Sequence, residues 1–308
     1  MSNPIRIGTR ASKLALWQAN KVKNILEAEG FSCVLIPIQS QGDKNLTQPL
    51  YEMGITGVFT KALDLALLNN RIDLAVHSYK DVPTKLPKTL KQLAVLQRGF
   101  TTDVLVTKKP IDLSKPLTIA TGSLRRKAQW LHRFPNHKIV GLRGNVNSRL
   151  EKLESHAWDG AIFAKAGLER LQITPAHFKE LHDFLPAPAQ GAVMVMTQES
   201  NTKTRALTDV LNCNQTAICT NAERVFLRTL EGGCSAPIAA LATLEDNALT
   251  FNGALYALDG SKKISVGQTF KMAAPMQKDK ITQFAEQCAS YILNNGGNAL
   301  LNTIKAQL

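Results

Sequence analysis

Short apolar runs alternate with amphipathic helical patterns over the first two thirds of the chain. In the first hundred residues, a short strand is predicted at residues 5–9, an apolar strand at 31–38 and a strand with a continuous apolar run at 72–76, and helical patterns occupy residues 14–26 and 59–68. A strand that is buried on both faces has this continuous apolar character, because side chains on both sides meet the core. The order therefore predicts a β-α-β-α-β unit whose sheet is mostly parallel.

The same alternation returns after residue 100. It predicts strands at residues 103–107, 117–120, 138–142 and 160–164, and helices at residues 122–134 and 146–153. A later apolar run, residues 191–196, follows Pro186-Ala187-Pro188, and we expect it to return the chain to the first unit. The two halves therefore form two similar α/β lobes.

The pattern changes near Gln215. A long helix is predicted to Leu230, followed by strands at residues 238–244, 249–258 and 264–270 and a helix at residues 280–293. Strands followed by a helix are typical of an α+β domain with an antiparallel sheet. We predict three domains: lobe 1 (1–97 and 191–213), lobe 2 (98–190) and a third domain (214–308).

The excess of basic over acidic residues indicates that the protein binds an anionic partner. The 308 residues contain 37 Lys and Arg against 24 Asp and Glu, a formal net charge of +13. Such a surplus indicates nucleic acid, a membrane surface or an acidic small molecule. The aromatic content of 6% argues against the stacking platforms of single-strand binders. No apolar run has the length of a membrane span, and the N-terminus has no secretion-signal pattern.

The cations favour the small-molecule interpretation because they follow the predicted strands. In an open α/β sheet, ligands bind beyond the carboxyl ends of the strands, often at helix N-termini. Guanidinium groups suit carboxylates. We therefore expect a polyanionic ligand in a cleft between the lobes. The cationic loops are Thr9-Arg10-Ala11-Ser12, residues 77–83, residues 121–126 and residues 142–149.

Two residues stand out from these loops. Asp81 is a carboxylate among cations, and it is either a charge partner for the arginines or an anion that stabilises a positive intermediate and moves a proton. Cys234 follows Gly232-Gly233 at a predicted loop tip, and it is either a small buried hydrophobe or a functional thiol. The five cysteines fit neither a disulfide framework nor a metal motif, which favours a reducing cytoplasm. The histidine spacing predicts no metal site.

Four motifs together resemble the porphobilinogen deaminase family, also called hydroxymethylbilane synthase. They occur in order as His77-Ser78-Tyr79-Lys80-Asp81-Val82-Pro83, Gly122-Ser123-Leu124-Arg125-Arg126, Leu142-Arg143-Gly144-Asn145-Val146 with Arg149, and Glu231-Gly232-Gly233-Cys234. The resemblance implies two periplasmic-binding-protein-like lobes and a third domain whose cysteine holds a dipyrromethane cofactor through a thioether. Four porphobilinogen units would be added stepwise with loss of ammonia. Water would then release the linear tetrapyrrole hydroxymethylbilane for heme biosynthesis.

The resemblance also implies roles for individual residues. Asp81 and Lys80 match catalytic positions, and Cys234 matches the cofactor cysteine. Cofactor contacts are implied for Lys80, Asp81, Ser78, Asp43, Thr121, Ser123, Arg125 and Arg126. Substrate contacts are implied for Arg10, Ser12, Gln18, Arg143, Arg149 and Arg170.

The chain departs from the family's usual pattern at a few positions. Gln41 replaces an arginine, the segment at Thr56 lacks a lysine, and Tyr79 replaces a methionine. None of these changes removes a group expected to be catalytic. We expect a cytoplasmic, monomeric transferase that binds porphobilinogen and neither nucleic acid nor membrane. The alternative is a non-catalytic two-lobed anion-binding protein.

Overall fold

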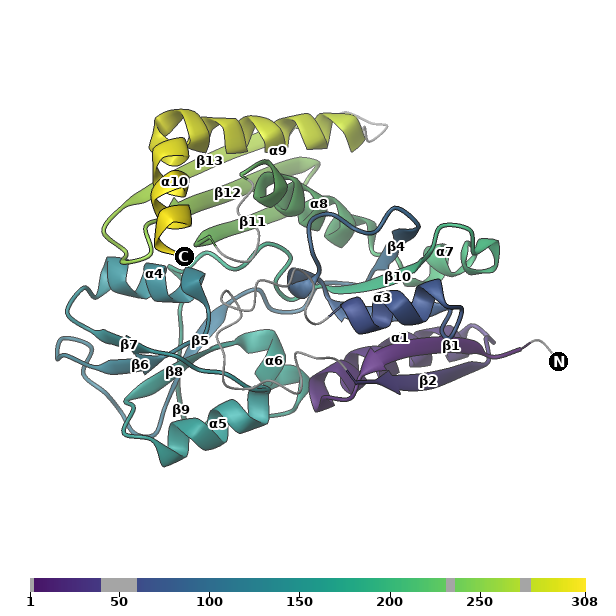
Figure 1. The fold of residues 1–308 in the computed structure, drawn as a ribbon, viewed down its shortest axis with the longest axis horizontal. Helices are drawn as coiled ribbons and strands as arrows, with labels where there is room; N and C mark the ends of the chain where they lie inside the picture. The colour runs from purple at the N-terminus through teal and green to yellow at the C-terminus, as the bar shows by residue number, and fades with distance from the viewer. Residues whose placement is uncertain (1–2, 40–59, 231–235, 272–277) are drawn as a thin grey trace. The chain divides into compact units, whose positions relative to one another are not determined.

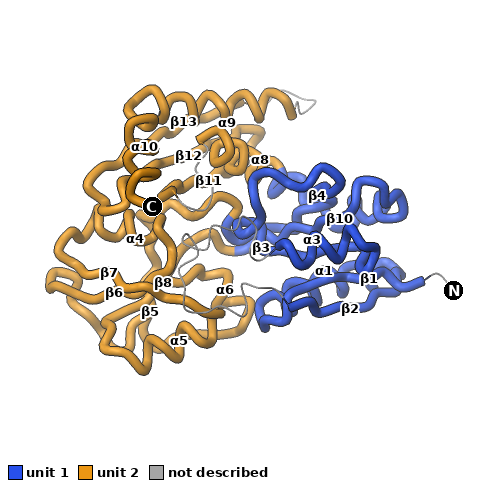
Figure 2. The backbone as a smooth tube through the Cα atoms, viewed as in Figure 1, with its two compact units in different colours: residues 1–46, 55–99, 190–217 blue, residues 47–54, 100–189, 218–308 orange. Residues whose placement is uncertain are grey.

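The computed structural model describes residues 3–39, 60–230, 236–271 and 278–308. These residues belong to two compact units, shown in different colours in Figure 2. Unit 1 comprises residues 1–46, 55–99 and 190–217, and unit 2 comprises residues 47–54, 100–189 and 218–308. The second unit thus contains both the predicted lobe 2 and most of the predicted third domain, and the three-domain division stays a prediction.

Unit 1 is built on a five-stranded sheet of order β2-β1-β3-β10-β4. The pairs β1–β2 and β1–β3 are parallel, whereas β10 is antiparallel to both β3 and β4, so four strands run one way and β10 runs the other. The predicted return of the chain to lobe 1 is therefore confirmed. The strands are β1 (Ile5–Arg10), β2 (Cys33–Ile38), β3 (Leu74–Ser78), β4 (Leu90–Val95) and β10 (Val193–Gln198).

Helices cover both faces of this sheet (Figure 1). Ile7 belongs to the core cluster that includes residues of α1 (Lys13–Ala28) and α7 (Leu207–Leu211). Its neighbour Gly8 faces the other way, because side chains alternate along a strand. A Cβ at Gly8 would lie 3.1 Å from Leu63 of α3 (Lys61–Leu68), so the glycine lets this helix lie close to the sheet.

Unit 2 contains a second five-stranded sheet with the order β7-β6-β8-β5-β9. Again four strands run one way, and β5 is antiparallel to both of its neighbours. Alternate residues of β5 pack into two cores, with Val104 on the face of α5 and Leu105 on the face of Trp130 from α4. The elements are β5 (Asp103–Thr107), β6 (Thr118–Ala120), α4 (Leu124–Arg133), β7 (Lys138–Val140), α5 (Val146–Ser155), β8 (Gly160–Ala164), α6 (Lys165–Arg170) and β9 (His177–Glu180).

The antiparallel sheet predicted near the C-terminus is also present in unit 2. It has the order β11-β12-β13, and helices pack against it around a core that includes Phe226, Phe251 and Phe284. The elements are α8 (Asn214–Thr229), β11 (Ile238–Glu245), β12 (Ala248–Tyr256), β13 (Lys263–Lys271), α9 (Lys278–Ile292) and α10 (Asn298–Gln307). In the described parts of both units, no helix is long and apolar enough to cross a bilayer.

Candidate active site

In unit 1, the chain topology brings the predicted residues to one edge of the sheet. Arg10 is the last residue of β1 and Ser78 the last of β3, and these two strands are parallel neighbours. Because β10 runs the opposite way, its first residue, Val193, pairs with Ser78. Gln190, just before β10, therefore reaches the same edge as the strand ends.

Buried Gln18 and half-buried Ser78 form a polar pair at this edge. Gln18 is 2% exposed on α1, and its Nε2 donates to Ser78 Oγ at 2.9 Å. Ser78 Oγ lies 3.2 Å from Gln18 Oε1, to which it donates. Ser12 caps the same helix by accepting from the Ala15 backbone N–H at 3.3 Å. The structure thus gives Gln18 and Ser12 local partners in addition to the substrate contacts expected of them.

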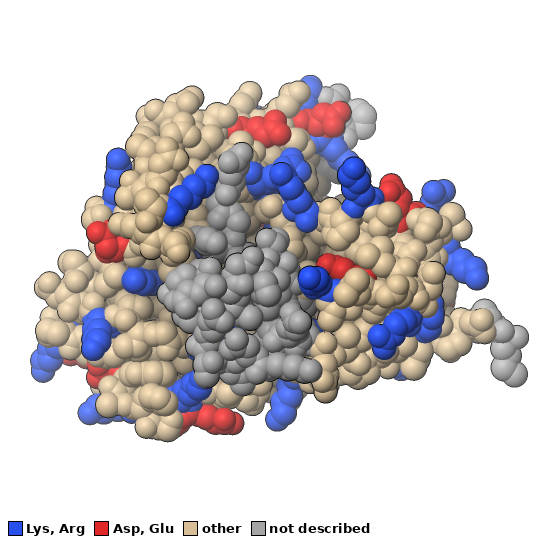
Figure 3. Space-filling view, in the orientation of Figure 1, with Lys and Arg blue, Asp and Glu red and all other residues tan. Residues whose placement is uncertain are grey.

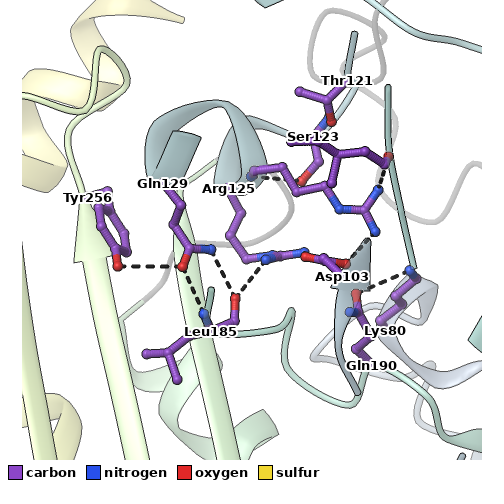
Figure 4. Close-up of polar contacts among 11 residues, drawn as sticks. Lys80, Asp103, Thr121, Ser123, Arg125, Gln129, Leu185, Gln190 and Tyr256 are labelled. Atoms are coloured by element: carbon purple, nitrogen blue, oxygen red, sulfur yellow. Dashed lines mark hydrogen bonds and ion pairs between the residues drawn. The ribbon is translucent and has the colours of Figure 1, made fainter. Parts of the chain in front are cut away.

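Lys80 and Asp81 lie in a short 3-10 turn, Tyr79–Asp81, directly after β3. The turn is held by buried Tyr79, whose hydroxyl donates to Gln92 Oε1 at 2.7 Å. Lys80 Nζ lies 3.5 Å from Gln190 Oε1, the long contact on the right of Figure 4. Asp81 is half-buried, and no hydrogen bond or ion pair joins its carboxylate to another residue of the described ranges.

His77 lies behind this turn on β3. It is 5% exposed, and burial, together with the positive charge of Arg10, lowers its pKa to about 4. Its imidazole is consequently neutral near neutral pH, which leaves Arg10 and Lys80 as cations at this edge.

In unit 2, the expected anion-binding residues follow three parallel strands, β6, β7 and β8. Thr121 and Ser123 come directly after β6 and begin α4. Ser123 Oγ accepts from the Arg126 backbone N–H at 3.4 Å, and Thr121 Oγ1 accepts from the Ser123 N–H at 3.3 Å. The Ser123 hydroxyl therefore caps the helix, the Thr121 hydroxyl holds the turn before it, and the helix N-terminus lies at the carboxyl end of the sheet.

Arg125 and Arg126 are buried rather than solvated, at 5% exposed each. Both bind one carboxylate, that of Asp103: Arg125 Nη2 donates at 2.8 Å and Arg126 Nη2 at 2.7 Å (Figure 4). Burial lowers the pKa of Arg125, and the charge of Asp103 opposes that effect. Asp103 was not among the residues predicted to bind a ligand, because in the sequence it marks only the start of a strand.

A further polar chain connects Arg125 with the antiparallel sheet of the same unit. Arg125 Nη1 and Gln129 Nε2 both donate to the Leu185 carbonyl, at 2.7 and 2.9 Å. Gln129 Oε1 accepts from the Leu185 N–H at 2.9 Å and lies 3.5 Å from the hydroxyl of Tyr256 on β12. Burial raises the pKa of Tyr256 to about 12, so its hydroxyl stays protonated and able to donate.

The remaining arginines follow β7 and β8. Arg143 and Arg149 are half-buried around the start of α5, whose cap Asn145 accepts from the Ser148 N–H at 3.0 Å. Arg170 is 8% exposed at the end of α6. Burial lowers the pKa of both Arg143 and Arg170. Since β6, β7 and β8 are parallel, Arg143, which follows β7, and the start of α6, which follows β8, lie at the same edge of the sheet as Ser123.

Two predicted residues, Cys234 and Asp43, lie outside the described residues, as do the departures at Gln41 and Thr56. On the face shown in Figure 3, lysine and arginine side chains outnumber acidic ones and are scattered over both units. This distribution differs from a single basic stripe along one helix.

Comparisons with known proteins agree over nearly the whole chain. Residues 5–206 match a family model described as porphobilinogen deaminase, dipyromethane cofactor binding domain, and residues 217–292 match its C-terminal domain. A porphobilinogen deaminase of Syntrophotalea carbinolica is 41% identical over 97% of this chain and 96% of its own length. One of Cytophaga hutchinsonii is 38% identical over 100% and 99%. Among solved structures, a periplasmic substrate-binding protein of an ABC transporter from Coxiella burnetii is 14% identical with a TM-score of 0.42, over 69% of this chain and 94% of that chain.

Proposed function

This chain belongs to the porphobilinogen deaminase family, and we propose on that premise that it condenses four porphobilinogen molecules into hydroxymethylbilane. Each addition releases one ammonia, and one water releases the finished tetrapyrrole. The observation that carries the proposal is the match of both family domains to residues 5–206 and 217–292. The strand-end cations support it, because porphobilinogen carries acetate and propionate groups.

The described residues have the chemistry that a dipyrromethane needs. That group carries several carboxylates, and Arg125 and Arg126 each have a buried Nε–H without an acceptor among the described residues. An anion would satisfy these donors, and a buried donor left unsatisfied costs about 1–3 kcal/mol. We propose that Arg125, Arg126, Ser123, Thr121, Ser78 and Lys80 hold the cofactor, with Asp43 and the attachment residue Cys234. When bound, the cofactor supplies the pyrrole carbon to which the first porphobilinogen is joined.

The reaction assigns Asp81 the central role. Loss of ammonia from porphobilinogen leaves positive charge on the pyrrole, and a nearby carboxylate stabilises that charge. The new carbon–carbon bond then requires removal of a proton from the pyrrole carbon, for which a carboxylate is a suitable base. Lys80 is placed next to Asp81 and would bind a carboxylate of the substrate or cofactor. Arg10, Ser12, Gln18, Arg143, Arg149 and Arg170 would bind the growing anionic chain.

The same proposal includes the working state of the protein: a monomer in the cytoplasm, with lobes 1–97 and 191–213, and 98–190, and a cofactor domain at 214–308. Free thiols at Cys33, Cys213, Cys219 and Cys288 are consistent with a reducing compartment.

Mass spectrometry of the intact denatured protein tests the proposal directly. Wild-type protein should be heavier than its sequence by one dipyrromethane and should consume porphobilinogen. Cys234→Ala should have the unmodified mass and no turnover. Cys33→Ala is the matched control, because Cys33 is a half-buried thiol on β2 that should not affect the added mass. An unmodified mass for active wild-type protein would contradict the proposal and favour an anion-binding protein.

A further inference from the structure

The position of Asp103 follows from the direction of one strand. β5 is antiparallel to β8, and its first residue, Asp103, pairs with Ala164, the last residue of β8. The start of β5 therefore lies at the edge of the sheet where β6, β7 and β8 end. Asp103 reaches the cationic edge for the same topological reason that Gln190 does in unit 1.

The contacts of Asp103 fix two guanidinium groups at once. Its carboxylate is 0% exposed and receives one Nη2 from each arginine. The other terminal nitrogens donate to backbone carbonyls, Arg125 Nη1 to Leu185 at 2.7 Å and Arg126 Nη1 to Ile162 at 3.0 Å. Each guanidinium is thereby held at two points, while both Nε–H groups lack an acceptor in the described part of the chain. A planar fork held at two points has one orientation available.

Asp103 also neutralises part of the positive charge of the two arginines. Arg125 and Arg126 are consecutive and buried, so their like charges repel and each has lost its hydration. One carboxylate shared between them leaves the group with a single positive charge. That charge matches one carboxylate of a bound ligand.

We propose that Asp103 is a positioning residue for the tetrapyrrole-forming reaction. Its carboxylate orients Arg125 and Arg126 so that their remaining N–H groups hold a carboxylate of the covalent dipyrromethane. This inference rests on the proposed function, and it adds a residue that does not itself touch the cofactor.

Asp103→Asn in the full-length protein tests the inference. The amide is isosteric, but it presents an oxygen to one arginine and an NH2 group to the other, which repels that guanidinium. We expect kcat per cofactor-loaded molecule to fall on the order of 10²-fold, as a displacement of about 1 Å near a reacting group can cause, with KM changed far less. The fraction of protein that carries the dipyrromethane mass should also fall. In an Arg126→Gln background, Asp103→Asn should lower kcat by a smaller factor than it does in wild type, because Arg125 is then the one arginine of the pair that Asp103 still orients.

Asp73→Asn is the matched control. Asp73 binds Arg6 through both carboxylate oxygens, at 3.0 Å from Nε and 2.8 Å from Nη2, away from the strand ends. This variant should lower the melting temperature and leave kcat and the added mass unchanged. Should Asp103→Asn fail to fold, Asp103→Glu keeps the charge and shifts the carboxylate by one methylene, and the same losses are expected from it.

Three results would overturn the inference. One is wild-type kcat and wild-type dipyrromethane content in folded Asp103 variants. Another is a loss in kcat that is fully additive with that of Arg126→Gln. The third is wild-type protein that lacks both the added mass and turnover, which refutes the proposed function itself and the inference with it.

Discussion

The buried imidazole of His77 should make unit 1 less stable in mild acid. In the folded chain its pKa is lowered to about 4, from an ordinary value of 6.5, chiefly by burial and secondly by the charge of Arg10. Above 6.5 the imidazole is neutral in both the folded and unfolded chains and has no effect. As the pH falls below 6.5, the unfolded chain takes up a proton that the folded chain excludes, so the free energy of unfolding decreases.

The magnitude follows from the two pKa values. Between pH 7 and pH 5, the loss of stability is about 2 kcal/mol, and below pH 4 it levels off at about 3 kcal/mol because both states are then protonated. In His77→Gln this contribution disappears. The variant should be less stable than wild type at pH 7, but its stability should fall by about 2 kcal/mol less on acidification.

Hydrogen exchange of the β3 amides, corrected for intrinsic exchange at each pH, measures this difference locally. A local probe is needed because a protein of two units need not unfold in one step. His182→Gln is the control, since the side chain of His182 is 75% exposed. Equal losses between pH 7 and pH 5 in wild type and His77→Gln would refute the reasoning.

Two further predictions concern the strand-end loops. Gly122→Ala would place a Cβ against the carbonyl oxygen of Leu142, so we expect it to lower the free energy of unfolding by about 1–3 kcal/mol and to lower the dipyrromethane content. Gly141→Ala is the control, because a Cβ there meets nothing within 4 Å. Equal melting temperatures for the two variants would contradict the prediction. Asp81→Asn should fold normally and lose kcat by about 10²-fold or more, measured as porphobilinogen consumption. Asp209→Asn is the control and should retain full activity, because Asp209 is exposed. Full activity in Asp81→Asn as well would show that Asp81 is only a surface charge.

Much of the fold could be predicted because its strands are buried on both faces. The runs at residues 5–9, 103–107 and 160–164 all became strands of the two five-stranded sheets. β9 (His177–Glu180) was missed because it is a short, mostly polar edge strand, which only its pairing with β5 identifies. α10 was missed because Gly296-Gly297 resembles a helix end. Gly296 does adopt a φ of +100°, but the chain resumes a helix at Asn298.

In the candidate site too, the residues marked by a local sequence pattern were predicted, and those placed there by strand pairing were not. Thr121, Ser123, Arg143 and Ser78 were found because they follow apolar runs, and strand ends are where open sheets bind ligands. Asp103 and Gln190 adjoin the starts of β5 and β10, the two strands that run against their neighbours. No local pattern marks a strand as antiparallel, so residues at the starts of these two strands could not be predicted to lie at the ligand-binding edge.

The structure also changes what the charge of the chain means for the ligand. The net charge of +13 predicted an anionic partner by counting cations as though each were available to it. At α4, however, two buried arginines share the carboxylate of Asp103, so the group carries one net charge while several of its N–H donors remain. In a buried group of this kind, desolvation makes an uncompensated second charge costly, whereas directed donors still bind a carboxylate. A ligand that gains carboxylates with each added unit must be bound at each step, and it must also be able to shift along the site before the next unit is added. Partly neutralised, fixed arginines of this kind meet both requirements better than free cations do. Raising the charge at α4 by Asp103→Asn should therefore not improve the enzyme, even though its product is an anion.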